Sequence, residues 1–220
     1  MAQVLQIQIV SDLVCPWCYV GKRRLERALA ARPAIRAAIS WLPFQLSPDM
    51  PREGKDRQAH YATIFGVDRA RDIMAGMQQT AAAEGLRFET NPGARSPNTL
   101  SAHVLLYWAD QAPNIDQNAL AERLFAAHHC ASEDLGDPAV LARIAGEAGM
   151  DPMTVAADLR AGKDEDRVQA LAAEARQAGV SGVPFFIFDR QHAASGAQPP
   201  EALLEILDRL SAPVGASRAS

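Results

Sequence analysis

The chain has 220 residues, of which 48% are hydrophobic and 22% charged, and its formal net charge is −4 at pH 7. This length supports a hydrophobic core without disulfides or metals, and an acidic chain without a run of Lys and Arg is not expected to bind nucleic acid. Because the first basic residue is Lys22 and no apolar run approaches the roughly 18 residues that span a bilayer, we expect no signal peptide, no membrane segment and a cytoplasmic location.

The N-terminal part of the chain predicts a strand–helix–strand unit. Residues 3–10 alternate between apolar and polar side chains, which is typical of a strand. A helix is expected over residues 16–32 and a second strand over residues 37–44. Cys15 and Cys18 lie at the junction of the first strand and the helix, where the chemistry of parallel α/β units is usually found.

The middle of the chain, residues 58–178, predicts five or six helices and no internal repeat. Three pairs of residues predict helix starts, because each places a capping side chain before a proline at the first helical position: Ser96–Pro97, Asp137–Pro138 and Asp151–Pro152. Gly149 and Gly179 are expected at helix C-termini.

The strand pattern returns near the C-terminus. Residues 183–188 and 192–196 predict a hairpin, and residues 199–210 predict a final helix with leucines on one face. The element order is therefore βαβ, a helical block and ββα, which is an α/β fold with a mixed sheet and a large helical insertion. We expect three parts: a first domain over 1–47 and 180–212, an inserted helical domain over 48–179, and a flexible tail over 213–220.

The Cys15-Pro16-Trp17-Cys18 motif has the spacing of a redox pair. Side chains at i and i+3 in a helical turn lie about 5–5.5 Å apart at Cβ, and a disulfide needs about 3.8 Å, so the bond can form with a small adjustment. The helix N-terminus favours a thiolate, which makes Cys15 the expected nucleophile and Cys18, one turn further in, the resolving thiol. Pro16 suits the first helical position, and Trp17 offers an apolar face to a substrate.

A zinc site is the main alternative for the cysteine pair, because two such cysteines form half of a tetrahedral site. The remaining candidate ligands are His128, His129 and Cys130, which point to different faces of a helix and so cannot all bind one ion. We therefore expect no metal. The two histidines suit a helix end, where the helix dipole favours positive charge, and Cys130 suits a small buried apolar position.

Val183–Pro184 and His103 are the other residues of interest. A proline that begins a strand cannot donate to the ladder, and both a trans bond and a cis bond in a tight turn remain open. His103 lies on the helix expected to start at Pro97, where a packed core histidine is the ordinary interpretation.

Three stretches of the sequence together resemble the DsbA-like thioredoxin superfamily, and within it the cytoplasmic FrnE-like branch. They are residues 11–21 around the cysteine pair, Pro97-Asn98-Thr99 with Ala102-His103, and residues 179–186 leading to 195–199. The resemblance spans nearly the whole chain. The same superfamily includes 2-hydroxychromene-2-carboxylate isomerases and kappa-class glutathione transferases, which usually carry Ser at the position of Cys15.

The resemblance implies a thioredoxin-like fold in which Pro184 is a cis-proline facing the Cys15–Cys18 disulfide. Val183 would present backbone groups to a substrate, His103 would lie near the active-site cleft, and the helical block would cover the active site. The implied substrates are thiols or disulfides, of proteins or of small molecules. No cofactor is required, although glutathione stays open, as does a two-fold homodimer.

The sequence thus predicts a thiol–disulfide oxidoreductase. A second hypothesis is a glutathione-dependent isomerase or transferase acting on an aromatic or polyketide-like small molecule, which would stay active after Cys18→Ser. A third is a protein-binding module with a vestigial cysteine pair, whose binding would survive the loss of both cysteines.

Overall fold

The computed structural model describes residues 4–211, so the predicted tail over 213–220 lies outside the described residues. The elements in chain order are β1 (Leu5–Ser11), α1 (Pro16–Ala30), β2 (Ala37–Pro43), β3 (Lys55–Asp56), α2 (Arg57–Phe65), α3 (Val67–Ala83), β4 (Arg95–Ser96), α4 (Leu100–Gln111), α5 (Gln117–Cys130), α6 (Pro138–Glu147), α7 (Pro152–Arg160), α8 (Glu165–Gln177), β5 (Phe185–Phe188), β6 (His192–Ser195) and α9 (Pro200–Ser211). The predicted α/β class and its helical insertion are confirmed. No helix within residues 4–211 is long and apolar enough to cross a membrane.

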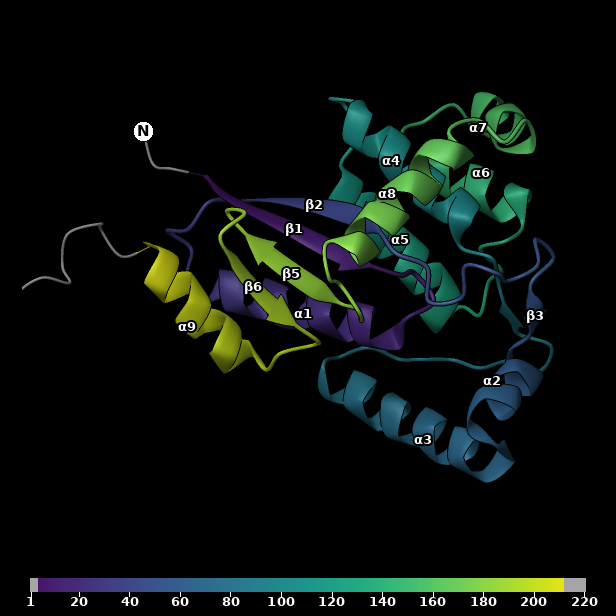
Figure 1. The fold of residues 1–220 in the computed structure, drawn as a ribbon, viewed down its shortest axis with the longest axis horizontal. Helices are drawn as coiled ribbons and strands as arrows, with labels where there is room; N and C mark the ends of the chain where they lie inside the picture. The colour runs from purple at the N-terminus through teal and green to yellow at the C-terminus, as the bar shows by residue number, and fades with distance from the viewer. Residues whose placement is uncertain (1–3, 212–220) are drawn as a thin grey trace, which may run out of the picture.

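The main sheet has four strands in the order β2-β1-β5-β6. β1 is parallel to β2 and antiparallel to β5, and β6 is antiparallel to β5, so the sheet is mixed as predicted. Ile9 of the central strand β1 pairs with Trp41 on one side and Phe186 on the other, and all three side chains are buried. Helices α1 and α9 pack against each other beside this sheet (Figure 1).

Seven helices lie between β2 and β5, more than the five or six predicted. One reason is Gly66, whose φ of 81° breaks the run of residues 57–83 into α2 and α3. The predicted caps at Asp137 and Asp151 are confirmed, because each carboxylate accepts hydrogen bonds from backbone N–H groups of the first turn. Gly149 and Gly179 follow their helices with positive φ angles, as expected of C-terminal glycines.

The helix start predicted at Ser96–Pro97 is wrong. Ser96 pairs with Lys55 in the short β3–β4 ribbon, and α4 begins only at Leu100. The side chain of Asn98 explains the delay, since its Oδ1 accepts a hydrogen bond from the backbone N–H of Leu100 (2.9 Å) and its Nδ2 donates to the carbonyl of Met50 (2.6 Å). These bonds hold the segment as a turn before the helix can start.

The helices of the insertion form two groups with different surroundings (Figure 1). In the first group, α4–α8, the helices α4, α5 and α8 contact the edge strand β2. The second group, α2 and α3, is here called the α2–α3 arm; α3 contacts α1, and the arm exposes most of its side chains. The arm buries Arg57, Ala70, Met77 and Ala81.

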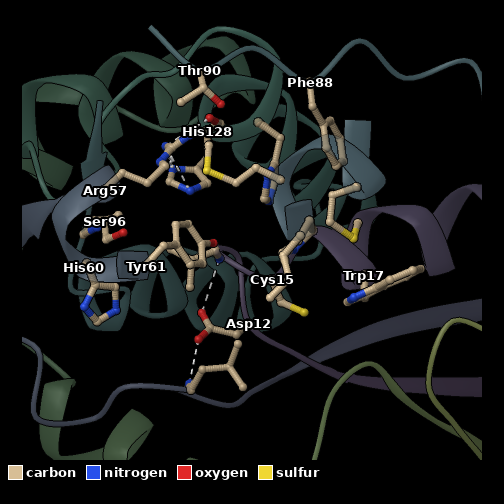
Figure 2. A pocket seen from close by; sticks show the side chains of 18 of the residues that line it. Asp12, Cys15, Trp17, Arg57, His60, Tyr61, Phe88, Thr90, Ser96 and His128 are labelled. Atoms are coloured by element: carbon tan, nitrogen blue, oxygen red, sulfur yellow. Dashed lines mark hydrogen bonds between the residues drawn. The ribbon is translucent and has the colours of Figure 1, made fainter. Parts of the chain in front are cut away.

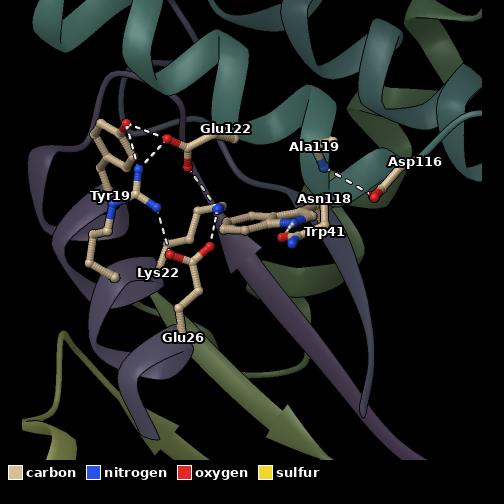
Figure 3. A network of polar contacts seen from close by, with 9 residues as sticks. Tyr19, Lys22, Glu26, Trp41, Asp116, Asn118, Ala119 and Glu122 are labelled. Atoms are coloured by element: carbon tan, nitrogen blue, oxygen red, sulfur yellow. Dashed lines mark hydrogen bonds and ion pairs between the residues drawn. The ribbon is translucent and has the colours of Figure 1, made fainter. Parts of the chain in front are cut away.

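A network of charged groups ties α1 to α5 (Figure 3). The buried Lys22 donates to Glu26 and forms an ion pair with Glu122 of α5 (2.7 Å). The hydroxyl of Tyr19 donates to the same Glu122 carboxylate (2.6 Å). Burial works to raise the pKa of Glu122, but Lys22 and Tyr19 outweigh burial and hold that pKa below its usual value. The Tyr19 ring also stacks on Phe125, with 5.2 Å between ring centroids. The start of α1, which carries the cysteine pair, is thereby fixed to α5.

Candidate active site

Cys15 occupies the N-cap position of α1, between the end of β1 and the first helical turn. Its backbone is extended (φ −81°, ψ 112°), and Pro16 takes the first helical position. The backbone N–H of Cys15 donates to the carbonyl of Asp12 (3.0 Å), which forms the turn that ends the strand. The Cys15 thiol lines a cavity and donates to the carbonyl oxygen of Val183, with Sγ and O 3.7 Å apart. The structure therefore brings together two predicted site residues from distant parts of the chain.

Cys18 lies one turn further into α1 and is fully buried, at 0% exposure. Burial raises the pKa of its thiol well above the usual value, and the neighbouring Cys15 sulfur raises it further. Ser11 and Asp12 work in the opposite direction but are outweighed. Both cysteines are free thiols in this structure, and Cys18 is held protonated beneath Cys15.

The Val183–Pro184 peptide bond is cis and precedes β5, which begins at Phe185 rather than at the predicted Val183. The carbonyl of Pro184 accepts a hydrogen bond from Gly196 (2.8 Å), which continues the hairpin beyond its last paired residues. Gly21 of α1 allows the proline ring to approach, because a Cβ at that position would lie 3.0 Å from the Cγ of Pro184. A larger residue at Gly21 would push Pro184, and with it the Val183 carbonyl, away from Cys15.

His103 lies behind the cavity wall and is almost completely buried. Its Nε2 donates to the carbonyl of Phe44 (3.0 Å) and lies 3.6 Å from Oδ1 of Asp12. Asp12 itself lines the cavity, and its other oxygen accepts from the backbone N–H of Leu46 (2.7 Å). His103 therefore meets the site through Asp12, a buried carboxylate next to the cysteine motif that the sequence analysis did not single out.

The cavity beside Cys15 has a volume of about 360 Å³ (Figure 2). Its walls come from the start of α1, the segment after β2, the α2–α3 arm and the end of α5. Trp17 stands at its rim with 43% of its surface exposed. The polar groups of the wall that sequence analysis missed include Asp12, Arg57, His60, Tyr61 and Thr90. Asp12 lies three residues before Cys15, whereas the other four come from segments that only the tertiary fold brings to the cysteines.

His128 and His129 also line the cavity, at the end of α5. Their predicted position at a helix end is confirmed, but this helix end is buried, and burial opposes the positive charge that the helix dipole favours. Burial and the charge of Arg57 lower the pKa of His129 to about 3, and burial holds the pKa of His128 well below its usual value. The Nε2 of His129 donates to the carbonyl of Leu13 (3.0 Å), which ties α5 to the turn before the cysteine pair.

Cys130 follows these histidines but is only partly buried, not buried as predicted. Burial of part of the side chain raises the pKa of its thiol. Within residues 4–211, no three His, Cys, Asp or Glu side chains gather in a way that would hold a metal ion.

The family model for the DSBA-like thioredoxin domain matches residues 6–208. The chain therefore belongs to the DSBA-like thioredoxin family, as the resemblance of its motifs predicted. Among solved structures it is similar to a probable DsbA oxidoreductase from Streptomyces coelicolor, with 31% identity, a TM-score of 0.80, and coverage of 93% of this chain and 89% of the other.

Two further structures share the fold at lower identity. A 2-hydroxychromene-2-carboxylate isomerase has a TM-score of 0.69 at 15% identity, with 93% of this chain and 95% of the other covered. The cytosolic disulfide reductase DsbM from Pseudomonas aeruginosa, solved with glutathione, has a TM-score of 0.63 at 15% identity, with 93% and 98% covered. The fold is thus shared by oxidoreductases and an isomerase.

Proposed function

We propose that the protein is a thiol–disulfide oxidoreductase in which Cys15 is the nucleophile and Cys18 the resolving thiol. One observation carries the proposal: Cys15, although only 5% exposed, lines a cavity, while Cys18 is 0% exposed and does not line it. A substrate disulfide bound in the cavity therefore meets the Cys15 sulfur first. This arrangement assigns the two cysteines different roles.

The proposed reaction is a two-electron exchange. The Cys15 thiolate attacks one sulfur of the substrate disulfide, the substrate S–S bond breaks, and the other half leaves as a thiolate. Cys18 then attacks the Cys15 sulfur, and its proton passes to the departing thiolate. A Cys15–Cys18 disulfide forms, the second substrate thiol is released, and the dithiol has supplied both electrons. The reverse sequence oxidises a substrate dithiol.

The surroundings of the pair support these roles. Cys15 lies at the N-cap of α1, so its sulfur faces the positive end of the helix dipole. The raised pKa of Cys18 keeps that sulfur unreactive until a mixed disulfide has formed on Cys15. The carbonyl of Val183, in contact with the Cys15 thiol, is placed to accept a hydrogen bond from a bound substrate.

The proposed exchange requires no metal or organic cofactor, and glutathione is a candidate thiol substrate. A cytoplasmic location fits the assignment, since the similar fold of DsbM belongs to a cytosolic disulfide reductase. Substrate contact is assigned to Pro16 and Trp17 at the cavity mouth and to Val183 and Pro184 beside Cys15.

The test is to trap the mixed disulfide. Cys18→Ser is expected to accumulate a covalent adduct with glutathione disulfide through Cys15, detected by mass spectrometry, and to lose turnover. Cys15→Ser is expected to form no adduct at the pair, and Cys130→Ser, a control at a partly exposed cysteine, is expected to keep full turnover. Turnover that survives Cys18→Ser would contradict the proposal and favour a glutathione-dependent isomerase or transferase instead.

A further inference from the structure

Arg57, in the first turn of α2, is a buried guanidinium in the wall of the Cys15 cavity. Only 6% of its surface is exposed. Its Nε donates to the carbonyl of Arg95 (3.2 Å), and its Nη2 contacts the ring and the carbonyl of His128 (3.2 and 3.5 Å). Its Nη1 donates to no described residue, and no carboxylate within residues 4–211 forms an ion pair with Arg57. A guanidinium stays charged in proteins, so this charge is buried without a counter-ion.

None of the titratable groups near Arg57 forms an ion pair with its guanidinium. His128 and His129 are uncharged, since burial lowers the pKa of both rings. Asp134 is close enough to influence Arg57 but is paired with Arg95 (3.6 Å). The two carboxylates that line the cavity are Asp12, which accepts from the N–H of Leu46, and the exposed Glu89, and neither forms an ion pair with Arg57. Among the described residues, the Arg57 guanidinium therefore has no direct ion-pair partner.

The rest of the cavity wall is mostly apolar and adaptable. Its apolar side chains include Met50, Ile64, Ile73, Met74, Met77 and Phe88. Three of these are methionines, whose flexible thioethers fit ligands of varied shape. A cavity of about 360 Å³ lies within the range of small-molecule sites, in which a few polar groups orient a largely apolar ligand.

The Arg57 end and the Cys15 end belong to one continuous cavity (Figure 2). Tyr61 of α2 lines the same cavity, and Figure 2 shows its ring between Arg57 and Cys15. A ligand that fills this cavity therefore borders both the guanidinium and the sulfur.

We infer that this cavity binds a small disulfide with an apolar or aromatic body and an anionic group, the anionic group on Arg57 and the disulfide at Cys15. The inference rests on the proposed function and names its substrate class. Cys15 attacks the near sulfur and the far half leaves as a thiolate; Cys18 then forms the protein disulfide and releases the anionic half as a thiol. The protein dithiol is oxidised and the ligand disulfide is reduced, with no further reactant.

The experiment compares two aromatic disulfides in single-turnover reactions with the reduced full-length protein. Dithiobis(nitrobenzoate) is a dianion and dithiodipyridine is neutral, and both release a coloured thiol. All variants carry Cys130→Ser so that only the Cys15–Cys18 pair reacts. The test variants are Arg57→Gln and Arg57→Lys, and Arg69→Gln, an exposed arginine on α3 outside the cavity, controls for net charge.

Arg57→Gln is expected to lower the second-order rate constant for the dianion roughly ten-fold, the size of a lost charge-assisted hydrogen bond, and that for the neutral disulfide less than about two-fold. Arg57→Lys is expected to fall between Gln and the parent, and Arg69→Gln to change neither rate. Equal slowing of both disulfides, no slowing of either, or the same selective loss in Arg69→Gln would overturn the inference. If Cys15→Ser reacts as fast as the parent with both probes, the proposed function itself fails.

Discussion

The α4–α8 helices and the α2–α3 arm come from one stretch of sequence but bury very different shares of their surface. Phe125 of α5 is 0% exposed and meets Trp41 edge to face, with ring centroids 5.5 Å apart. Phe65 of α2 is 37% exposed and contacts Tyr61 of its own helix, with 6.1 Å between ring centroids. The α4–α8 helices thus extend the core of the sheet, whereas the arm mainly supplies one wall of the cavity.

Because of this difference in burial, we expect substitutions in the α4–α8 helices to change mainly the stability and substitutions in the arm to change mainly the contact with substrate. Loss of a side chain from α5 leaves a hole among residues of the sheet and of α1, which the surrounding structure cannot fill. Loss of a side chain from the exposed part of the arm changes a surface that is already open to water. Pairs of variants, one in each group of helices or one inside and one outside the cavity, measure the two effects.

The largest effect is expected from the two phenylalanines. Phe125→Ala should lower the free energy of unfolding by about 3–5 kcal/mol, because it removes a fully buried ring. Phe65→Ala should lower it by less than about 1 kcal/mol, because its ring is partly exposed. Urea unfolding followed by circular dichroism measures both values, and losses of similar size would remove the distinction between the two groups of helices.

The next effect concerns pH and the buried histidine His129. Its pKa of about 3 in the folded protein lies below the ordinary value of about 6.5. Between these pH values the unfolded chain binds a proton at His129 that the folded chain does not bind. The contribution of His129 to the free energy of unfolding is therefore fully present above pH 6.5 and is lost as the pH falls. We expect His129 to lower the free energy of unfolding by about 2 kcal/mol between pH 7 and pH 5.

Urea unfolding at several pH values checks this slope. His129→Gln should reduce the slope over pH 5–7, and His192→Gln, at an exposed position on β6, should leave it unchanged. A parent slope near zero, or the same slope in His129→Gln as in the parent, would show that this ring is not held neutral by burial.

The smallest effect is expected on the arm, and it concerns reaction rate rather than stability. Ile64 lines the cavity beside Cys15, whereas Val67, which is also exposed, does not line it. Ile64→Ala should slow the reaction with neutral dithiodipyridine roughly three-fold, because it removes apolar contact with the ligand. Val67→Ala should leave the rate unchanged, and both should change stability by less than about 1 kcal/mol. A slower reaction in Val67→Ala would show that the cavity does not define the substrate contact.

Local patterns in the sequence were sufficient to predict most of the fold. The alternation around Ile7 and Ile9 predicted the central strand, and the Asp–Pro pairs at 137–138 and 151–152 predicted two helix starts that the carboxylates do cap. The wrong predictions of secondary structure occurred where tertiary contacts determine the backbone conformation. The β3–β4 ribbon has two residues in each strand, too few for a pattern, and Ser96 looked like a helix cap because its partner Lys55 is far away in the sequence.

The same limit applies to the candidate site. The cysteine motif was visible because its spacing is local, and the order of its burial followed from its position on a helix. Arg57 was not visible, because its burial and its missing counter-ion depend on how the arm and α5 meet. His129 was correctly predicted at a helix end, but its burial, which lowers its pKa, depends on tertiary contacts that the local pattern does not contain.

The most direct test of the central claim is the redox equilibrium of the Cys15–Cys18 pair in glutathione buffers, followed by alkylation of free thiols and mass spectrometry. The account predicts one two-electron transition at a potential between about −270 and −120 mV, the range from thioredoxin to DsbA. The transition should disappear in both Cys15→Ser and Cys18→Ser and persist in Cys130→Ser. A pair that stays reduced in every buffer would contradict the account.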